Sequence, residues 1–372
     1  MVGVASERLR LAGLSLISFA RGIPAPECLP VAELADCAKA ALARDGRVAL
    51  SYGSTLGYEP LREWIAEQHG VEPERVVVTN GSLQAFHLVL ESLGDDAQVI
   101  VERPTYDRPR KILTEKVGAF REVGIDGDGL DADELERSLP AGADLLYTIP
   151  TFQNPTGSTL SEERRVRLAV LARRRVLPIL EDDPYGLVRF EGRPLPTLFE
   201  LAGGEGVTYS SSFSKTIAPG VRVGYLIVRA PLVPELEVRA AATYITPALL
   251  AQATVYEFLR RGLFEPNLER VQRLLRERRD AMLTALETEL GERARWSRPE
   301  GGYFLWLELA EDVDSATLLA RATDAGVTFV PGPDFGGPPN TARLAFSFVS
   351  PAEIEEGVRR LAAAAVPAPA HG

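Results

Sequence analysis

The sequence predicts an α/β fold built around a mostly parallel, seven-stranded sheet with helices on both faces. Short runs rich in β-branched residues alternate with helical patterns, at intervals of about 20 to 30 residues. The runs cover residues 75–78, 99–101, 119–123, 145–149, 176–181, 207–209 and 221–228. Such alternation is typical of βαβ crossovers, which make neighbouring strands parallel, and ligands bind outside the carboxyl ends of the strands in these sheets.

A later change of pattern predicts a second, smaller α+β domain. Residues 231–290 show helical periodicity, and short apolar runs at 301–307, 327–330 and 342–347 precede a final helix over 351–363. We predict four parts along the chain. They are an N-terminal arm with part of the small domain (1–47), the large domain (48–240), the small domain (241–363) and a disordered tail (364–372).

The first part of the chain predicts an extended arm followed by a helix. Residues 16–30 are rich in proline, which favours an arm without regular structure. Helical spacing predicts a helix over 31–43, which Asp45-Gly46 is expected to stop. The run 11–20 also resembles a short signal-peptide core, but Glu7 interrupts the basic region before it.

The composition favours a soluble protein that acts on small molecules. The chain is 45% apolar and 25% charged, and its 52 acidic residues outnumber its 41 basic ones. This balance argues against a basic surface for nucleic acid, and no apolar run reaches the ~20 residues of a membrane span. Cys28 and Cys37 form no zinc or disulfide pattern, so we expect a cytoplasmic protein without a metal.

The segment 211–225 carries the strongest chemical signal. Lys215 lies among the hydroxyls of Ser212 and Ser214, and Arg222 follows seven residues later. An amine that forms an imine and an anion site for a phosphate are the joint requirements of pyridoxal phosphate (PLP). We therefore predict PLP as the cofactor, with Lys215 as its amine. Taken alone, the segment also suits an ordinary surface turn.

This segment resembles the class I aminotransferases of PLP fold type I. It reads Ser-Phe-Ser-Lys-Thr-x-Ala-Pro-Gly-x-Arg-x-Gly-Tyr and is similar to the branch that contains 2-aminoadipate aminotransferases and the aminotransferase-like half of bacterial regulators. Four further motifs follow the family's order, and the resemblance covers residues 15–363. It implies the fold type I architecture, a large domain plus a smaller α+β domain, and a homodimer with active sites at the subunit interface.

The resemblance implies a phosphate site at the end of the first strand. Gly81, Ser82 and Leu83 open a helix there, and the free N–H groups of a helix start bind anions. A Gly-Ser cap without a ligand is the alternative. The family also has a tyrosine that reaches the phosphate of the partner subunit, which corresponds here to Tyr52, although a tyrosine that packs under its loop fits the same pattern.

Four residues are expected around the cofactor ring by resemblance. Tyr106 in a Pro-Thr-Tyr motif would stack on the ring, or else pack in the core. Asn154 in Asn-Pro-Thr-Gly and Tyr185 in Asp-x-x-Tyr would contact the 3′-oxygen, although the first motif is also a simple turn. Asp182 would keep the ring nitrogen protonated.

Two further acids flank Asp182. Glu181 and Asp183 are expected to support it or to face solvent. Three successive acids also suit a metal cluster, but no histidine is near and the side chains would alternate faces if the strand continued.

The substrate site is expected to combine the arm with the last strand. Arg343, in Arg-Leu-x-x-Ser, would bind the substrate α-carboxylate together with Asn154, and Gly22 would bring its backbone close. Arg21 departs from the family's Phe-Ala-Gly-Gly arm. It either faces solvent or reaches a distal acidic or phosphate group of the substrate.

The resemblance implies an aminotransferase that moves an amino group between an α-amino acid and a 2-oxo acid through a Lys215 Schiff base. Lys215 would also move the proton between Cα and C4′. The same fold supports elimination, γ-replacement, cyclisation and C–C bond chemistry, and a catalytically idle PLP-binding sensor is a further alternative. No DNA-binding module precedes the region of resemblance, so a regulator is not expected.

Overall fold

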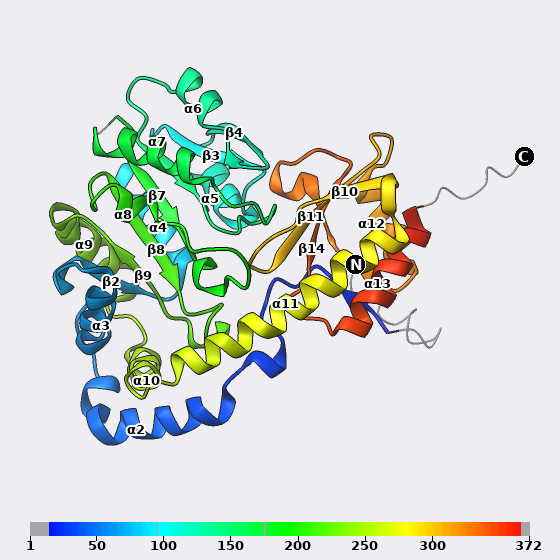
Figure 1. The fold of residues 1–372 in the computed structure, drawn as a ribbon. Helices are drawn as coiled ribbons and strands as arrows, with labels where there is room; N and C mark the ends of the chain where they lie inside the picture. Colours follow the sequence, from blue (N-terminus) through cyan, green and yellow to red (C-terminus); the bar gives the residue numbers. More distant parts are fainter. Residues whose placement is uncertain (1–14, 95, 175, 366–372) are drawn as a thin grey trace, which may run out of the picture.

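An eight-stranded sheet lies at the centre of the larger of two lobes in the computed structural model, which describes residues 15–94, 96–174 and 176–365 (Figure 1). Its strands are β2 (Val76–Thr79), β3 (Val99–Arg103), β4 (Arg121–Asp126), β5 (Gly129–Leu130), β6 (Leu145–Thr148), β7 (Ile179–Asp182), β8 (Val207–Ser212) and β9 (Gly224–Ile227). The strand order is β2-β9-β8-β7-β6-β3-β4-β5. The adjacent strands β8, β7, β6, β3 and β4 are parallel, while β2, β9 and β5 pair antiparallel.

The predicted mostly parallel sheet is therefore confirmed, with one correction to its size. All seven predicted strands are present, and β5 adds an eighth at the edge. The extra strand has only two residues, which is too short for a pattern of alternating residues to reveal.

Helices cover both faces of this sheet because its side chains alternate between two cores. Val77, Val101 and Tyr147 point into one core, whereas Val76, Ile100 and Leu146 point into the other. The first core packs against α4 (Ser82–Leu93), α5 (Asp107–Lys116) and α9 (Val233–Tyr244). The second packs against α3 (Glu59–His69), α6 (Ala132–Ser138), α7 (Glu162–Arg173), α8 (Leu198–Leu201) and α10 (Leu249–Arg260).

The smaller lobe contains a four-stranded antiparallel sheet in the order β10-β11-β14-β13. Its strands are β10 (Ala294–Trp296), β11 (Phe304–Leu309), β13 (Val330–Pro331) and β14 (Thr341–Ala345), and its helices are α12 (Ser315–Asp324) and α13 (Pro351–Ala365). The long helix α11 (Phe264–Glu289) runs from the large lobe to this one (Figure 1). The strand predicted over 327–330 is two separate short strands, since β12 (Val327–Thr328) ends before β13 begins.

The N-terminal arm is more regular than its prolines predict. β1 (Ile17–Ser18) pairs in parallel with β12, and the Phe19 carbonyl accepts a hydrogen bond from Ala345 N at 2.7 Å. A short 3₁₀ helix follows at Pro26–Cys28. The arm is ordered by pairing with distant residues of the small lobe, which local sequence cannot indicate.

The helix after the arm also runs past its predicted end. α2 covers Val31–Ala49, but Asp45 has a non-helical φ of −129°, so the helix is broken at the predicted place and a second helical piece follows the kink. The Asp45 carboxylate accepts hydrogen bonds from Arg44 and from the Tyr58 hydroxyl. These tertiary contacts, with the packing of α2 on α10, hold the helix together beyond the kink.

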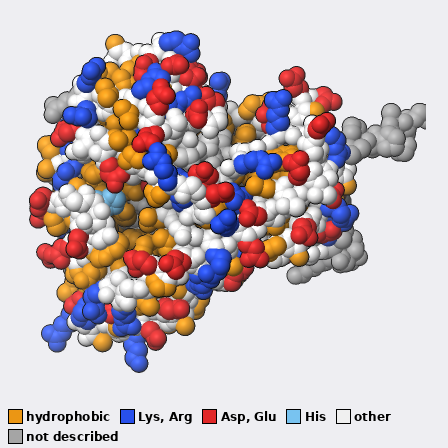
Figure 2. Space-filling view, viewed as in Figure 1, with side chains coloured by type: hydrophobic (Ala, Val, Ile, Leu, Met, Phe, Trp, Pro, Cys, Tyr) orange, Lys and Arg blue, Asp and Glu red, His pale blue; other side chains and the backbone are white. Residues whose placement is uncertain are grey.

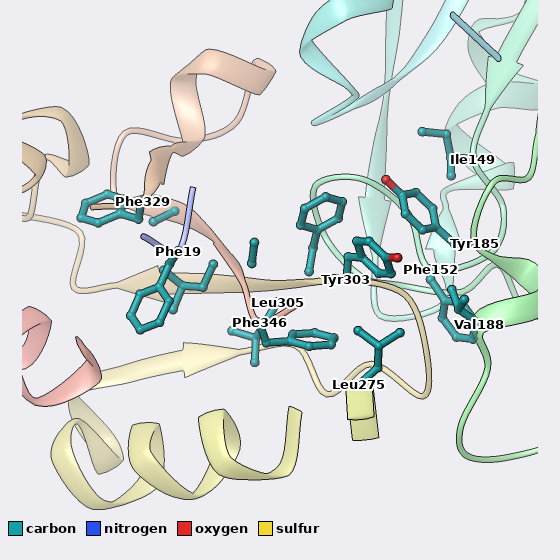
Figure 3. Close-up of a cluster of buried hydrophobic side chains, with 14 of the residues drawn as sticks. Phe19, Ile149, Phe152, Tyr185, Val188, Leu275, Tyr303, Leu305, Phe329 and Phe346 are labelled. Atoms are coloured by element: carbon teal, nitrogen blue, oxygen red, sulfur yellow. The ribbon is translucent and has the colours of Figure 1, made fainter. Parts of the chain in front are cut away.

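One hydrophobic cluster joins the two lobes (Figure 3). Phe19 of the arm, with Phe329 and Phe346 of the small lobe, lies at one end, and Ile149 and Tyr185 of the large lobe lie at the other. All of these side chains are at least 96% buried, because none is more than 4% exposed. The division of the chain at residues 47, 240 and 363 stays a prediction.

The surface mixes charges of both signs. Figure 2 shows acidic and basic side chains interspersed over both lobes on the face in view. Among residues 15–94, 96–174 and 176–365, no helix is both long and apolar enough to cross a membrane. Most of the predicted disordered tail, residues 366–372, lies outside the described residues, as do residues 11–14 of the signal-peptide alternative. Residues 364 and 365 belong to α13.

Candidate active site

Lys215 lies where the carboxyl ends of the parallel strands meet the N-terminal arm. It follows β8, and its Nζ donates a hydrogen bond to the Gly22 carbonyl at 2.8 Å. Burial, together with the positive charges of Arg343 and Arg222, lowers the pKa of Lys215 to about 8. With this pKa, about a tenth of the amine is neutral at pH 7, far more than for an ordinary lysine, which makes Lys215 a capable nucleophile and base.

Asp182 is the last residue of β7 and is only 5% exposed. Its Oδ2 accepts a hydrogen bond from the Tyr147 hydroxyl at 2.9 Å. Its Oδ1 is buried and has no hydrogen-bond partner within the described part of the chain. Burial raises the pKa of Asp182 to about 7. A buried acceptor without a partner costs free energy, so this oxygen suits a ligand that brings a cationic N–H group.

The neighbours of Asp182 do not face solvent, which corrects one of the two predicted alternatives. Glu181 is fully buried and accepts hydrogen bonds from the backbone N–H groups of Leu198 and Phe199, both at 2.9 Å. Asp183 accepts hydrogen bonds from Gly186 N at 2.8 Å and the Tyr209 hydroxyl at 3.1 Å. Both acids therefore fix the loops that surround the end of β7.

The predicted phosphate residues after β8 form one hydrogen-bonded group. Arg222 donates from Nη1 to Ser214 Oγ at 3.5 Å and from Nη2 to the Asn80 carbonyl at 2.7 Å. The Ser212 hydroxyl lies 2.8 Å from that of Ser214. The segment 212–222 thus presents a guanidinium and two hydroxyls at the same place, anchored to the distant Asn80 carbonyl, which is a suitable environment for a phosphate.

The start of α4 completes this anion site. Gly81 has a φ of +101°, and a Cβ there would lie 2.4 Å from Arg222 Nη2. A Cβ on Gly224 would lie 2.8 Å from Ser82 N. Glycine is therefore required at both positions for the arginine and the helix start to approach each other. The N–H groups of Ser82 and Leu83 are in the first turn of α4, where helices bind anions.

The three predicted ring residues lie around the same space. The negative charge of Asp182 acts on both Tyr106 and Tyr185, and burial raises the pKa of Tyr106 to about 12. The Tyr185 ring centre is 5.6 Å from Lys215 Nζ. Asn154 is 3% exposed, and its Oδ1 accepts a hydrogen bond from Arg343.

Arg343 on β14 brings the small lobe into the site. Its Nη1 lies 2.9 Å from Asn154 Oδ1, and its Nη2 lies 3.0 Å from the Ala20 carbonyl. Its guanidinium carbon is 4.3 Å from the ring centre of Phe304 and 4.7 Å from that of Phe335. Burial lowers the pKa of Arg343 from its ordinary value. Both hydrogen-bond partners of this buried arginine are uncharged, so its positive charge remains available for a carboxylate ligand.

Two predicted residues are not joined to this group. Tyr52 is 81% exposed on the loop between α2 and α3, which excludes packing under that loop within the chain. Arg21 is exposed, and its guanidinium carbon lies 5.0 Å from the centre of the Phe348 ring.

Three residues that sequence reasoning missed support the site. Tyr147 positions Asp182, and the Tyr303 hydroxyl donates a hydrogen bond to the Lys215 carbonyl at 2.9 Å. Gln153 holds the turn beside Asn154, because its amide contacts Glu102 and the Pro104 carbonyl at 3.0 and 2.9 Å. The Gly-Gly-Tyr start of the strand predicted over 301–307 was the one available signal for Tyr303.

Comparisons with known proteins agree with this geometry. Residues 22–361 match the family model of aminotransferase class I and II. The chain is 41% identical to a 2-aminoadipate transaminase of Thermus thermophilus, over 93% of this chain and 89% of that protein. It is 34% identical to aromatic-amino-acid aminotransferase 1 of Thermococcus litoralis, over 96% and 89% of the two chains.

A solved structure has the same fold. The α-aminoadipate aminotransferase of Thermus thermophilus, in complex with N-(5′-phosphopyridoxyl)-L-leucine, superposes with a TM-score of 0.89 at 38% identity, over 97% of this chain and 96% of that one. The chain thus belongs to the aminotransferase class I and II family. It is a PLP-dependent aminotransferase of fold type I, as the sequence predicts.

Proposed function

We propose that this aminotransferase uses Lys215, Asp182 and Arg343 to move an amino group between an α-amino acid and a 2-oxo acid. The observation that carries the assignment is the buried Oδ1 of Asp182, which has no hydrogen-bond partner within the described residues and belongs to a carboxylate whose charge acts on Lys215. A ring nitrogen that bears a proton is the partner that this oxygen lacks. The phosphate would bind to Ser82, the Leu83 amide, Ser212, Ser214 and Arg222, where Gly81 allows the close approach.

PLP, when bound, supplies an aldehyde for the amine of Lys215 and an aromatic ring that takes up the electrons of the substrate's Cα–H bond. Asp182 would hold the ring nitrogen through an ionic hydrogen bond. Tyr106 would stack on the ring, while Asn154 and Tyr185 would contact its 3′-oxygen. Lys215, with a pKa lowered to about 8, is suited to remove the proton from the substrate Cα and deliver it to C4′ of the cofactor, on the other side of the shared nitrogen.

Substrate binding is assigned to Arg343 and the arm. The guanidinium of Arg343 would take the α-carboxylate through two parallel hydrogen bonds, with Asn154 beside it. Its Nε has no partner within the described residues, which leaves a donor for the substrate. Gly22 would bring its backbone close to the same carboxylate. The named substrates of the two relatives support an α-amino acid with a free carboxylate, acidic or aromatic.

A second copy of the chain would complete the site. Tyr52 is 81% exposed, and Leu50 next to it is 71% exposed. Ile245, 58% exposed, is tied to the same loop because Thr55 Oγ1 donates to its carbonyl at 3.0 Å. Exposed apolar residues that gather beside a site mark an interface. The Tyr52 hydroxyl would then reach the cofactor phosphate of the partner, in a cytoplasmic homodimer.

The spectrum of the bound cofactor tests the reaction. Purified holoenzyme mixed with single amino acids should convert to pyridoxamine phosphate and release the matching 2-oxo acid. If every productive amino acid instead leaves PLP unchanged, elimination, γ-replacement or cyclisation becomes the better assignment. Dilution tests the dimer, since activity should fall as the protein dissociates and a fully active monomer would contradict the role of Tyr52.

A further inference from the structure

Arg21 is an exposed arginine on the N-terminal arm. Its guanidinium lies over the Phe348 ring at 5.0 Å. Within residues 15–94, 96–174 and 176–365, no carboxylate lies within 4.0 Å of it. The acid of its own arm, Glu27, pairs with Arg278 instead. In a chain with a net charge of −11, an arginine without an acidic partner among the described residues is available to a ligand.

The backbone on both sides of Arg21 is attached to the site. The Ala20 carbonyl accepts a hydrogen bond from Arg343 at 3.0 Å, and the Gly22 carbonyl accepts one from Lys215 at 2.8 Å. A substrate would have its α-carboxylate at Arg343 and its Cα at Lys215. Its side chain therefore begins beside the residue between these two contacts, which is Arg21.

We propose that Arg21 is a subsite for an anionic group at the far end of the substrate side chain, and that the enzyme prefers amino acids with a second carboxylate or a phosphate there. This inference rests on the proposed function. The aromatic stacking on Phe348 holds the guanidinium without using its N–H donors, so these remain free for a two-point contact with an oxyanion.

Matched substrates test the subsite in the full-length holoenzyme. The values of kcat/KM are compared for 2-aminoadipate against norleucine and for glutamate against norvaline, pairs that differ in the terminal group. In Arg21→Gln, kcat/KM should fall about 10- to 100-fold for the acidic member, as when a hydrogen bond to a charged group is lost, and less than about 3-fold for the neutral one. O-phosphoserine distinguishes a phosphate preference from a carboxylate preference.

Two further variants sharpen the result. Arg21→Lys keeps a point charge without the planar fork and should lose less than Arg21→Gln. Arg295→Gln removes another exposed arginine, on β10, and should change neither member of a pair. Binding of unreactive glutarate, followed by the cofactor absorbance, should weaken in Arg21→Gln while binding of valerate does not.

Equal changes for acidic and neutral substrates in Arg21→Gln would overturn the subsite. That result is distinct from failure of the proposed function, in which the wild-type enzyme would form no pyridoxamine phosphate with any amino acid.

Discussion

The two halves of the active site are assembled in different ways. Asp182 and Lys215, which would bind the cofactor, follow the adjacent parallel strands β7 and β8 of one sheet. Arg343, which would bind the substrate, depends on hydrogen bonds to Asn154 and Ala20, which precede it by 189 and 323 positions in the sequence. The cofactor half thus depends on the carboxyl ends of two neighbouring strands in one sheet, while the substrate half depends on the docking of the arm and the small lobe. The difference indicates that cofactor capture and substrate recognition can be lost separately.

Loss of the amine should have the largest effect, because it removes the reactive group of the cofactor half. Lys215→Ala should lower kcat/KM by more than about 10⁴-fold. Borohydride should fix the cofactor on the wild-type chain at Lys215, which peptide mapping can locate readily because the other lysines are only Lys39, Lys111 and Lys116. Lys111→Ala is the control and should remain active. Reducible linkage in Lys215→Ala would contradict the assignment.

Loss of Arg343 should damage the substrate half and spare the cofactor half. Arg343→Ala should cost on the order of 2–5 kcal/mol in transition-state binding of an α-amino acid, because a buried charged contact is lost. The visible spectrum of the bound cofactor should remain, since Arg343 makes no hydrogen bond to the predicted phosphate residues. A variant that no longer retains PLP would show that the two halves are not separable.

The pH dependence of PLP capture should reveal the electrostatic effect of Arg343, in the substrate half, on Lys215, in the cofactor half. Only the neutral amine adds to an aldehyde, so capture of PLP by the apoprotein should accelerate about tenfold per pH unit below pH 8 and level off above it. Arg343 lowers the pKa of Lys215, so Arg343→Ala should move the plateau to higher pH. An unchanged midpoint in stopped-flow measurements would mean that the two charges do not interact.

The smallest effect is expected where the small lobe contacts the Lys215 backbone. Tyr303→Phe removes the hydroxyl that bonds to the Lys215 carbonyl but keeps the buried ring. The free energy of unfolding of the holoenzyme should fall by about 1 kcal/mol, and Tyr303→Leu should cost more because the ring is also lost. Denaturant titration measures both. Equal stability of Tyr303→Phe and the wild type would show that the hydroxyl contributes nothing to folding.

The sequence was informative where structure is local. Asp182 ends β7 and Lys215 follows β8, and each lies in a short continuous motif, so local residues together with the family resemblance were enough to propose them. Tyr147 was missed because it lies inside β6. In the sequence, a strand tyrosine whose hydroxyl bonds to Asp182 cannot be distinguished from a tyrosine that only packs in the core. The continuation of α2 past Asp45 was also beyond prediction, since it depends on Tyr58 and α10.

The attachment of the arm has a consequence for how the chain becomes an enzyme. Phe19 accepts a hydrogen bond from Ala345 and Gly22 accepts one from Lys215, so the arm obtains its partners only after residues far along the chain have been made. Contacts of such large sequence separation close late and slowly. During synthesis, which runs from the N-terminus, the strands of the large lobe can form before the arm has its partners. We therefore expect the catalytic pocket to mature after the strands of the large lobe.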